Sequence, residues 1–414
     1  MKYAIVTFGC RVNQADSLRL EMELCARGAE AVDPGRADLV IVNTCSVTAT
    51  ADQGARQAIR RVARENPQAT IVATGCYATR CEDDVAALPG VVRVVRNDDK
   101  LRLLDFVPEV NVPEHDGPCG TPIEPGIAGR TAFTIRAQTG CEEACAFCII
   151  PKTRGAARSL PIEALVEEAR RAAAAGFKEI AIAGVHLGSY GRDLSPRTSL
   201  FDLLGAFAAI DADVSYRISS LEPMECTEPI VDLVATSGRF MPHFHLPLQH
   251  ASDRILRAMR RPYTLDHYRR LVDGIQARLP QVAIGTDLLV GFPGETDDDF
   301  AAMTAYVASA PLSHLHVFPY SERPGTEAAR MAGRVPPAVI RDRGAELRRI
   351  GAGLAARFRA SQVDSERPGL TLEDGTLVVT DNYLKVRVPP GLPRNTRVRV
   401  RIAAGNAVGS AVVQ

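Results

Sequence analysis

The sequence predicts an α/β protein in three successive parts: a doubly wound N-terminal domain, a partial (βα)6 TIM-like barrel and a small C-terminal β-barrel. A chain of 414 residues is too long for one ordinary domain. Short apolar runs alternate with helical patterns over most of its length, which indicates parallel sheets covered by helices. The last part instead has short strands separated by glycine, proline and asparagine, as in small barrels.

Composition and charge narrow the class of protein. Hydrophobic residues make up 46% and charged residues 24%, which excludes a disordered chain. Lys+Arg and Asp+Glu are both 49, which excludes a uniformly basic coat for nucleic acid. No apolar run is long enough to cross a membrane, and the N-terminus runs directly into strand-like sequence without a signal peptide. We therefore expect a cytoplasmic protein with no membrane partner.

The first part, residues 1–110, reads as a doubly wound α/β domain. Its apolar runs predict strands, and the spacing between them predicts helices that end near glycine or proline. The expected strands are residues 3–8, 37–43, 69–74 and 91–96, and the expected helices are 14–27 and 50–65. Residues 111–130 are rich in proline and glycine without periodicity, which predicts a linker.

The second part, residues 131–355, repeats the strand–helix alternation about six times. The expected strands are residues 132–136, 179–183, 216–219, 244–246, 283–290 and 312–318, with helices at 162–175, 200–209, 228–237, 265–277 and 296–308. An eight-unit barrel needs about 250 residues, so an open, partial barrel fits better. A charged helix at 336–360 leads into residues 356–414, where strands are expected at 376–380, 384–388, 397–402 and 407–412.

Three cysteines lie in one short loop after the first barrel strand. Cys141, Cys145 and Cys148 form a CxxxCxxC pattern, with no histidine or fourth cysteine at ligand spacing to complete a zinc site. Three thiolates suit a cubane 4Fe-4S cluster that leaves one iron without a protein ligand. The alternatives are a zinc site completed from a distance and three unrelated buried cysteines. The carboxyl end of a barrel strand is where such folds place their chemistry.

This motif and its setting resemble the radical S-adenosylmethionine superfamily. The resemblance implies that the open iron binds the amino and carboxylate groups of S-adenosyl-L-methionine. Reduction then cleaves this cofactor to a 5′-deoxyadenosyl radical, while the protein holds the sulfonium and excludes water.

A second set of cysteines is spread over the first part. Cys10, Cys45 and Cys76 each follow a separate apolar strand. Successive strands of a parallel sheet end on one edge, so three loops bring three thiols to one place. This predicts a second 4Fe-4S cluster with an open iron; the alternative is that the cysteines are small buried apolar residues.

The two cysteine groups together resemble the methylthiotransferase family within that superfamily, and the likeness extends to a C-terminal TRAM barrel. The resemblance implies a transferase that replaces an unactivated C–H bond with C–S–CH3. One cofactor molecule gives the methyl group, a second gives the radical, and the auxiliary cluster carries or supplies sulfur. It also implies a sulfur donor and an electron donor such as flavodoxin or ferredoxin as partners.

Local motifs select a branch of this family. Residues 9–14, 43–48 and 184–188, together with 147–151 and 154–155, look like the branch that acts on tRNA. That branch converts N6-threonylcarbamoyladenosine at position 37, in the anticodon stem-loop, to its 2-methylthio derivative. Residues 248–252 look closer to the branch that modifies an aspartate of a ribosomal protein. Isopentenyladenosine in tRNA is the third alternative substrate.

Other side chains are candidates for binding. The resemblance places Gly184 beside the cofactor, with a plain turn as the alternative, and His186, His245 and Gln249 are expected to bind the cofactor. Asp297–Asp299 are expected to cap a helix. Arg154 and Arg158 are expected to meet a phosphate or cofactor carboxylate, or to be solvated. No catalytic side chain is assigned beyond the cysteines, and no role is assigned to Cys25, Cys81, Cys119 or Cys226.

The C-terminal residues form a basic segment. Residues 383–414 contain six basic residues and no acid, and several alternate with apolar residues on one strand face. We expect an RNA-binding track made by Lys385, Arg387, Arg397, Arg399 and Arg401, with a solvated barrel face as the alternative. If the cysteines held zinc instead of iron, the protein would be a zinc-stabilised RNA-binding module without catalysis.

Overall fold

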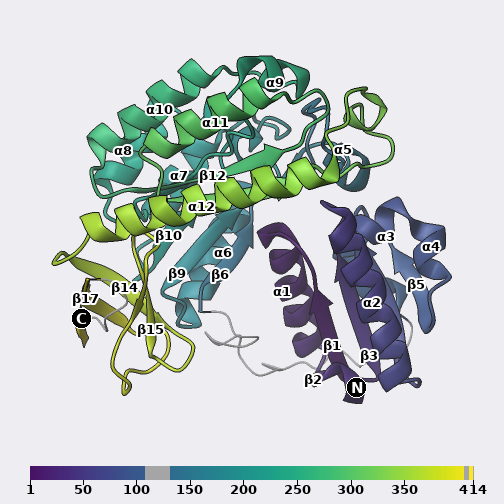
Figure 1. The fold of residues 1–414 in the computed structure, drawn as a ribbon. Coiled ribbons are helices and arrows are strands. Elements are labelled where there is room, and N and C mark those ends of the chain that lie inside the picture. Colours follow the sequence, from purple (N-terminus) through teal and green to yellow (C-terminus); the bar gives the residue numbers. More distant parts are fainter. Residues whose placement is uncertain (108–130, 405–409, 414) are drawn as a thin grey trace.

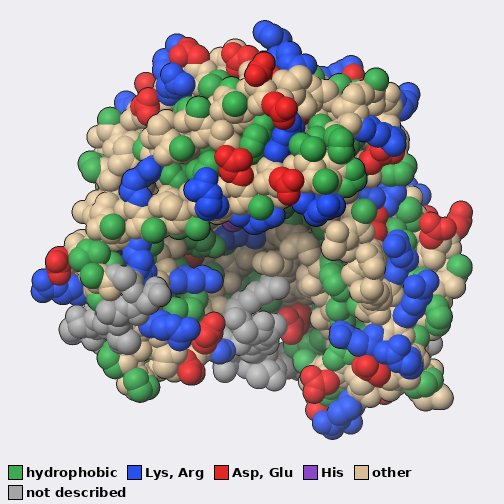
Figure 2. Space-filling view, in the orientation of Figure 1, with side chains coloured by type: hydrophobic (Ala, Val, Ile, Leu, Met, Phe, Trp, Pro, Cys, Tyr) green, Lys and Arg blue, Asp and Glu red, His purple; other side chains and the backbone are tan. Residues whose placement is uncertain are grey.

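The computed structural model describes residues 1–107, 131–404 and 410–413, the last of these as backbone only. The linker predicted at 111–130, and Cys119 within it, lie outside the described residues. Figure 1 shows the barrel at the top, with the N-terminal domain (purple) and the C-terminal sheet (yellow) below it. Figure 2 shows the same face hollowed between these two parts. Among the described helices, none is long and apolar enough to cross a membrane.

The N-terminal sheet has five parallel strands in the order β2-β1-β3-β4-β5. Their bounds are β1 (Lys2–Thr7), β2 (Glu30–Ala31), β3 (Leu39–Thr44), β4 (Thr70–Gly75) and β5 (Val91–Val95). The helices are α1 (Arg11–Ala26), α2 (Ala49–Glu65), α3 (Cys76–Arg80) and α4 (Glu82–Ala86). Alternate residues of β3 pack on opposite faces, with Leu39 and Ile41 in the α1 core and Val40 and Val42 in the α2 core. The domain is therefore doubly wound, as predicted.

The barrel wall consists of two three-stranded parallel sheets, β10-β9-β6 and β11-β12-β13. Isolated bridges between Tyr216 and Phe240 and between Ser220 and His245 join them. The strands are β6 (Phe133–Arg136), β9 (Glu179–Ala183), β10 (Ser215–Ile218), β11 (His243–His245), β12 (Ala283–Val290) and β13 (His314–Pro319). Among the described strands, no pairing joins β6 to β13, which confirms an open barrel.

Helices cover the outside of this wall and bury one large apolar core. They are α5 (Ile150–Arg154), α6 (Ile162–Ala174), α7 (Leu200–Ala208), α8 (Glu228–Thr236), α9 (Asp253–Ala258), α10 (Leu265–Arg278) and α11 (Asp297–Ser309). A small antiparallel pair, β7 (Gln138–Thr139) and β8 (Arg158–Ser159), brackets the loop after β6. Helix α12 (Pro337–Ser361) packs on β13 and leads to the C-terminal part (Figure 1).

The C-terminal part is a five-stranded antiparallel sheet in the order β16-β15-β14-β17-β18. Its strands are β14 (Glu366–Leu372), β15 (Leu377–Thr380), β16 (Lys385–Arg387), β17 (Arg397–Arg401) and β18 (Ser410–Val413). It wraps around a core that includes Val378, Val386, Val398 and Val400. Inward valines alternate with outward basic residues, which accounts for the period-2 pattern of the sequence.

Several elements were not predicted from the sequence: the short elements β2, α3, α4, α5, β7, β8 and α9, and the central strand β14. The run Pro368-Gly369 in β14 reads as a turn because proline lacks an amide hydrogen and rarely lies in a central strand. Pro368 pairs with Arg399 of β17 only, since pairing with β15 begins at Gly369. The proline therefore lies just past the end of the pairing with β15, where its carbonyl oxygen still accepts from the amide of Asp381 at 2.9 Å.

A buried ionic cluster joins the N-terminal domain to the barrel. Asp16 of α1 is 3% exposed, and its carboxylate accepts hydrogen bonds from Lys100 Nζ at 3.1 Å and Arg154 Nη2 at 3.3 Å, and also from Arg136 of β6. Burial alone would raise the pKa of Asp16, but Lys100, Arg136 and Arg154 outweigh it and hold the pKa well below its usual range. Two of these cations belong to the barrel, so the cluster fixes how α1 docks.

We expect Asp16→Asn to lower the free energy of unfolding by about 3–5 kcal/mol, because it leaves buried cations without their counter-charge. The exposed pair Asp266–Arg270 on α10 provides a matched control. Asp266→Asn removes the same charge at the surface and should cost less than about 1 kcal/mol. Urea titrations followed by circular dichroism compare the two variants with the wild type. Equal, small losses would show that the buried cluster does not hold the domains together.

Candidate functional site

The first cysteine group lies in the loop between β7 and α5, beyond the carboxyl end of β6. Gly140 opens this loop at φ 75°, and a Cβ atom there would lie 1.8 Å from the carbonyl oxygen of Ala156, so only glycine fits. The amide of Cys148 donates to the carbonyl oxygen of Cys145 at 3.1 Å. The loop is compact enough for Cys141, Cys145 and Cys148 to act on one another electrostatically.

Burial governs the chemistry of these three thiols. It raises the pKa of Cys141 to about 11 and that of Cys148 to about 12, and it also raises the pKa of Cys145. Arg261 partly opposes this effect by donating from Nη1 to Cys145 Sγ at 3.1 Å. At neutral pH the thiols therefore keep their protons unless metal cations replace them. Three clustered soft sulfur donors with this property fit an iron–sulfur cluster.

The second cysteine group gathers at the carboxyl edge of the N-terminal sheet. Thr7 is in register with Asn43, and Thr44 with Gly75, so β1, β3 and β4 end together. The loops then approach so closely that a Cβ atom on Gly9, at φ 95°, would lie 2.7 Å from Cys45 Sγ.

The thiols of this second group also act on one another. Burial raises the pKa of Cys45 to about 11, with smaller contributions from Cys76 and Cys10. The structure thus brings Cys10, Cys45 and Cys76 to one place, and three clustered sulfur donors suit an iron–sulfur cluster.

Arg154 of α5 connects the two cysteine groups. It follows the loop of Cys148, is 2% exposed, and hydrogen-bonds through its guanidinium to the thiol of Cys76. It also donates to Asn13 of α1 and, at 3.1 Å, to Thr139. Burial would raise the pKa of Cys76, but the positive charges of Arg154 and Lys100 outweigh it and lower the pKa. The alternative of a solvated Arg154 is therefore wrong, because its charge is buried against acceptors from both domains.

His186 lies next to the first cysteine group. Its Nδ1 atom is 3.9 Å from Cys141 Sγ, and its Nε2 atom is 3.9 Å from the Glu225 carboxylate. The backbone amides of Val185 and His186 donate to the side-chain oxygen of Gln138, which ties this loop to β7. Gly184 does not present open backbone here: an added Cβ atom would lie 3.0 Å from Leu187, within the same turn.

His245 and Gln249 lie at the end of β11 with two residues that the sequence did not single out. The Nδ1 atom of His245 is 2.7 Å from Ser220 Oγ, and its Nε2 atom is 3.1 Å from an oxygen of Asp287, which also lies 3.1 Å from Nδ1 of His316. Burial would raise the pKa of Asp287, but hydrogen bonds from the two histidines hold it at about 2. A charged carboxylate therefore lies at the barrel mouth.

A cavity of about 180 Å³ separates the two domains beside these residues. Val47 and Thr48, which follow Cys45, line one side, and Phe147, Gln249 and Asp287 of the barrel line the other. Gln249 adopts a φ of 68°, which is unusual for a residue other than glycine. The cavity is bordered by one loop from each cysteine group. A small molecule bound in it would therefore contact both loops.

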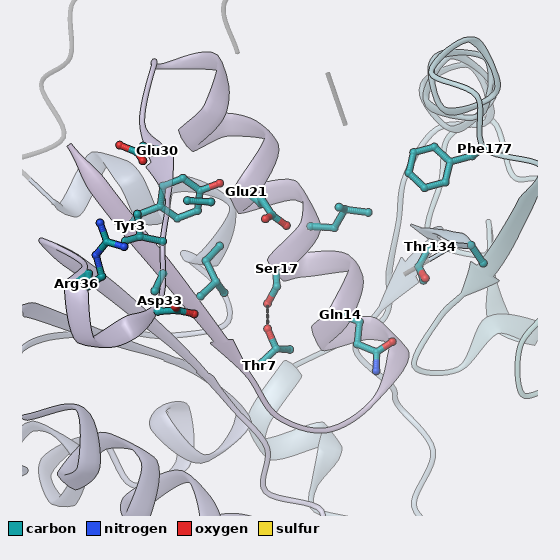
Figure 3. Close-up of a pocket in the computed structure, with 16 residues that line it drawn as sticks. Tyr3, Thr7, Gln14, Ser17, Glu21, Glu30, Asp33, Arg36, Thr134 and Phe177 are labelled. Atoms are coloured by element: carbon teal, nitrogen blue, oxygen red, sulfur yellow. Dashed lines mark hydrogen bonds between the residues drawn. The ribbon is translucent and has the colours of Figure 1, made fainter. Parts of the chain in front are cut away.

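A larger cavity, of about 710 Å³, lies on another part of the domain interface. Figure 3 shows Tyr3, Glu21 and Asp33 of the N-terminal domain on one side and Thr134 and Phe177 of the barrel on the other. Unlike the smaller cavity, it is lined neither by the loop that carries Cys141, Cys145 and Cys148 nor by the residues that follow Cys45. Its size alone therefore does not make it the reaction site.

The C-terminal basic residues do not form one free track. Arg397 contacts the barrel, with its Nε atom 3.0 Å from Asp213 and its Nη2 atom donating to the carbonyl oxygen of Lys178 at 3.1 Å. Arg399 and Arg401 lie on the exposed face, opposite acids of β14 and the turn before it: Arg399 is 3.6 Å from Glu366, and Arg401 is 3.3 Å from Asp364. The exposed residues Lys385 and Arg387 belong to the edge strand β16.

The other residues named in the sequence analysis are the acids at the start of α11, Arg158 and the cysteines outside the two groups. Thr296 and Asp299 form a capping box at the start of α11, which confirms the capping prediction. Arg158 pairs with Asp98 at the surface. The other described cysteines lie outside the two groups: Cys25 hydrogen-bonds with Tyr3 at 3.2 Å, Cys226 is buried, and Cys81 is half-buried after α3.

Arg261 and Glu222 are the residues that sequence reasoning missed at the first cysteine group. They form an ion pair beside Cys145, although more than a hundred residues separate Arg261 from that cysteine. The pair Arg260-Arg261 before Pro262 carries no motif. Asp287 and His316 lie inside strands that the sequence predicted. A polar side chain within such a barrel strand was the feature that could have identified them as site residues.

Known proteins match this chain along most of its length. Residues 2–96 match the sequence model of the uncharacterized protein family UPF0004, and residues 135–307 match that of the Radical SAM superfamily. The chain is 34% identical over 398 residues to the threonylcarbamoyladenosine tRNA methylthiotransferase MtaB of Aquifex aeolicus, covering 94% of this chain and 96% of that protein. It is 33% identical over 387 residues to the ribosomal protein uS12 methylthiotransferase RimO of Roseiflexus, covering 86% and 82%.

A solved structure supports the fold. The radical S-adenosylmethionine methyltransferase TsrM from Kitasatospora setae, with cobalamin and a [4Fe-4S] cluster bound, aligns with a TM-score of 0.57 at 16% identity, covering 79% of this chain and 76% of that chain. The sequence relatives exclude a zinc-stabilised binding module without catalysis. The chain belongs to the radical S-adenosylmethionine methylthiotransferase family, a family of transferases that use S-adenosylmethionine and [4Fe-4S] clusters.

Proposed function

We propose that this chain converts N6-threonylcarbamoyladenosine at position 37 of tRNA to its 2-methylthio derivative. The observation that carries the reaction is the pair of three-cysteine groups on neighbouring loops, joined through Arg154. Relatives named threonylcarbamoyladenosine tRNA methylthiotransferase MtaB from Aquifex aeolicus and Bacillus subtilis, each 34% identical, favour this substrate. Relatives named for uS12 and for dimethylallyladenosine reach similar identities, so these remain the alternative substrates.

The cysteines have assigned roles in this proposal. Cys141, Cys145 and Cys148 hold the [4Fe-4S] cluster that binds S-adenosyl-L-methionine, and Cys10, Cys45 and Cys76 hold the auxiliary [4Fe-4S] cluster. When bound, these groups supply a radical able to remove hydrogen from an unactivated C–H bond and the sulfur that replaces it. Cys45 and Cys76 are buried and Cys141, Cys145 and Cys148 are half-buried, whereas Cys10 is exposed and leaves the auxiliary site open on one side.

Side chains around the clusters hold and orient what binds there. Arg261 donates to Cys145 and Arg154 to Cys76, and each arginine places positive charge beside a thiolate. His186, His245 and Gln249 are the proposed contacts to S-adenosylmethionine, with Gly184 fixing the turn that positions His186.

The tRNA anticodon stem-loop is the proposed partner. Lys385, Arg387, Arg399 and Arg401 are exposed and contribute contacts to phosphate, whereas Arg397 chiefly docks the C-terminal sheet on the barrel. An electron donor of the flavodoxin or ferredoxin kind and a sulfur donor complete the proposed partners.

We expect the anaerobically reconstituted full chain to hold about eight irons, and the Cys141→Ala and Cys10→Ala variants to hold about four each. Each substitution removes a ligand from one group and leaves the other intact. Iron and sulfide assays with absorption spectra measure this. The matched control is Cys81→Ala, next to the second group, which should keep about eight irons. A wild-type content at or below four would contradict the assignment of two clusters.

In the organism that encodes this chain, we expect deletion of the gene to remove the 2-methylthio form of threonylcarbamoyladenosine from tRNA and to leave the unmethylthiolated nucleoside. Mass spectrometry of digested tRNA measures both. A wild-type copy should restore the product and a Cys10→Ala copy should not. If the tRNA nucleosides stay unchanged while ribosomal protein uS12 loses mass, the substrate is the ribosomal protein.

A further inference from the structure

Side chains from all three parts of the chain meet at one point near Cys10. Arg11, the first residue of α1, donates from Nη2 to the Tyr383 hydroxyl at 3.2 Å. The ring of Tyr383, in the C-terminal sheet, lies 4.5 Å from the ring of His243 in β11, and the guanidinium of Arg217 in β10 lies over it at 4.8 Å.

The position of Tyr383 is fixed by its neighbours in sequence. Its φ is 69°, a conformation that costs energy for a bulky side chain and persists where the surroundings impose it. Asn382 is fully buried and donates to the carbonyl oxygen of Gln281 at 2.9 Å and to Gln362 at 2.9 Å. Arg217 donates to the carbonyl oxygen of Asp381 at 3.0 Å. The hydroxyl of Tyr383 is therefore a preorganised partner that orients Arg11.

Arg11 is the cation of this junction that forms no ion pair among the described residues; it lies within electrostatic reach of Glu179, but that carboxylate is bound to Arg217. Arg217 is neutralised by Glu179, whose carboxylate lies 2.8 Å away. Burial keeps His243 uncharged by lowering its pKa, and burial lowers the pKa of His314 to about 4. Among the ion pairs of the described residues none includes Arg11, and its hydrogen bond goes to a neutral phenol. The half-buried guanidinium is therefore free to take an anionic ligand.

We propose that Arg11, oriented by Tyr383, binds the carboxylate of the threonylcarbamoyl group. This inference rests on the proposed function. The group on N6 and the reacting carbon C2 belong to the same six-membered ring of adenine, so the N6 group must lie close to the sulfur-bearing site. Arg11 directly follows Cys10, one of the proposed ligands of the auxiliary cluster. A planar guanidinium matches a carboxylate with two parallel hydrogen bonds.

The same arginine selects against the isopentenyl substrate. An apolar prenyl group offers no acceptor, so binding it would remove water from a charged guanidinium without replacing the lost hydrogen bonds. Sites built to hydrogen-bond a substrate group reject analogues that lack it far more strongly than apolar pockets reject small differences in size. Arg11 is thus a specificity residue, and no role in the radical step is assigned to it.

The test compares binding by the reconstituted full chain of three anticodon stem-loop oligonucleotides. One carries threonylcarbamoyladenosine, the second carries its methyl ester, and the third carries unmodified adenosine. Fluorescence anisotropy gives each Kd. We expect the wild type to prefer the free acid, and Arg11→Gln to lose about tenfold to a hundredfold of that preference. Tyr383→Phe, which removes only the orienting hydroxyl, should lose about two- to tenfold.

The matched control is Arg19→Gln, which removes the same charge from an exposed position of α1. It should keep the preference for the free acid. Iron content and S-adenosylmethionine cleavage without RNA should be unchanged in all variants, because Arg11 is not a cluster ligand. In turnover, the effect of Arg11→Gln should fall mainly on KM.

Three results would overturn the inference in distinguishable ways. If the wild type methylthiolates the threonylcarbamoyl oligonucleotide and Arg11→Gln keeps its full preference for the free acid, the assignment of Arg11 fails while the proposed function stands. If the wild type neither prefers nor methylthiolates that oligonucleotide, the proposed function and this inference fail together. Equal losses in Arg11→Gln and Arg19→Gln would show a general charge effect on RNA and would also overturn the inference.

Discussion

The arrangement of the whole molecule depends on one buried carboxylate with three cationic partners. Asp16 brings Lys100 of its own domain together with Arg136 and Arg154 of the barrel. Charges removed from water are tolerated only when they are paired with good geometry, so domains displaced from this arrangement would leave buried cations uncompensated. The same contact sets α1, which begins directly after Cys10, against β6, the strand that leads to the loop of Cys141.

Arginines from the barrel extend this electrostatic arrangement to the cysteines. Arg154 reaches Cys76 and Arg261 reaches Cys145, so a positive group lies beside a thiol in each trio. Burial opposes thiolate formation, and the arginines and bound irons favour it. Arg154 of the barrel takes part in docking the domains through Asp16, and it also lies beside Cys76 of the N-terminal domain. The position of the barrel therefore affects the charge around the second cysteine group.

The C-terminal sheet contributes a side chain to a junction of all three parts of the chain. Arg397 and the turn at residues 381–383 hold the sheet against the barrel through Asp213 and Arg217. The turn then presents Tyr383 to Arg11 of the N-terminal domain. The substrate recognition proposed above would therefore be divided among three parts of the chain, and the relatives that share the chemistry are named for different substrates.

The sequence by itself determined the cysteine trios, the doubly wound domain and the open barrel. These follow from local patterns: spacing of thiols in a loop, and apolar runs that end at Cys10, Cys45 and Cys76. It did not predict β14, whose Pro368-Gly369 run is unlike a central strand, because the pairing that makes this segment a strand is a property of the sheet. Tertiary structure alone decided that Arg154 is buried, that Arg397 contacts Asp213, and that Arg261 meets Cys145. These contacts join residues far apart in the chain, and the free energy that selects them comes from excluding water around charges after the domains have packed.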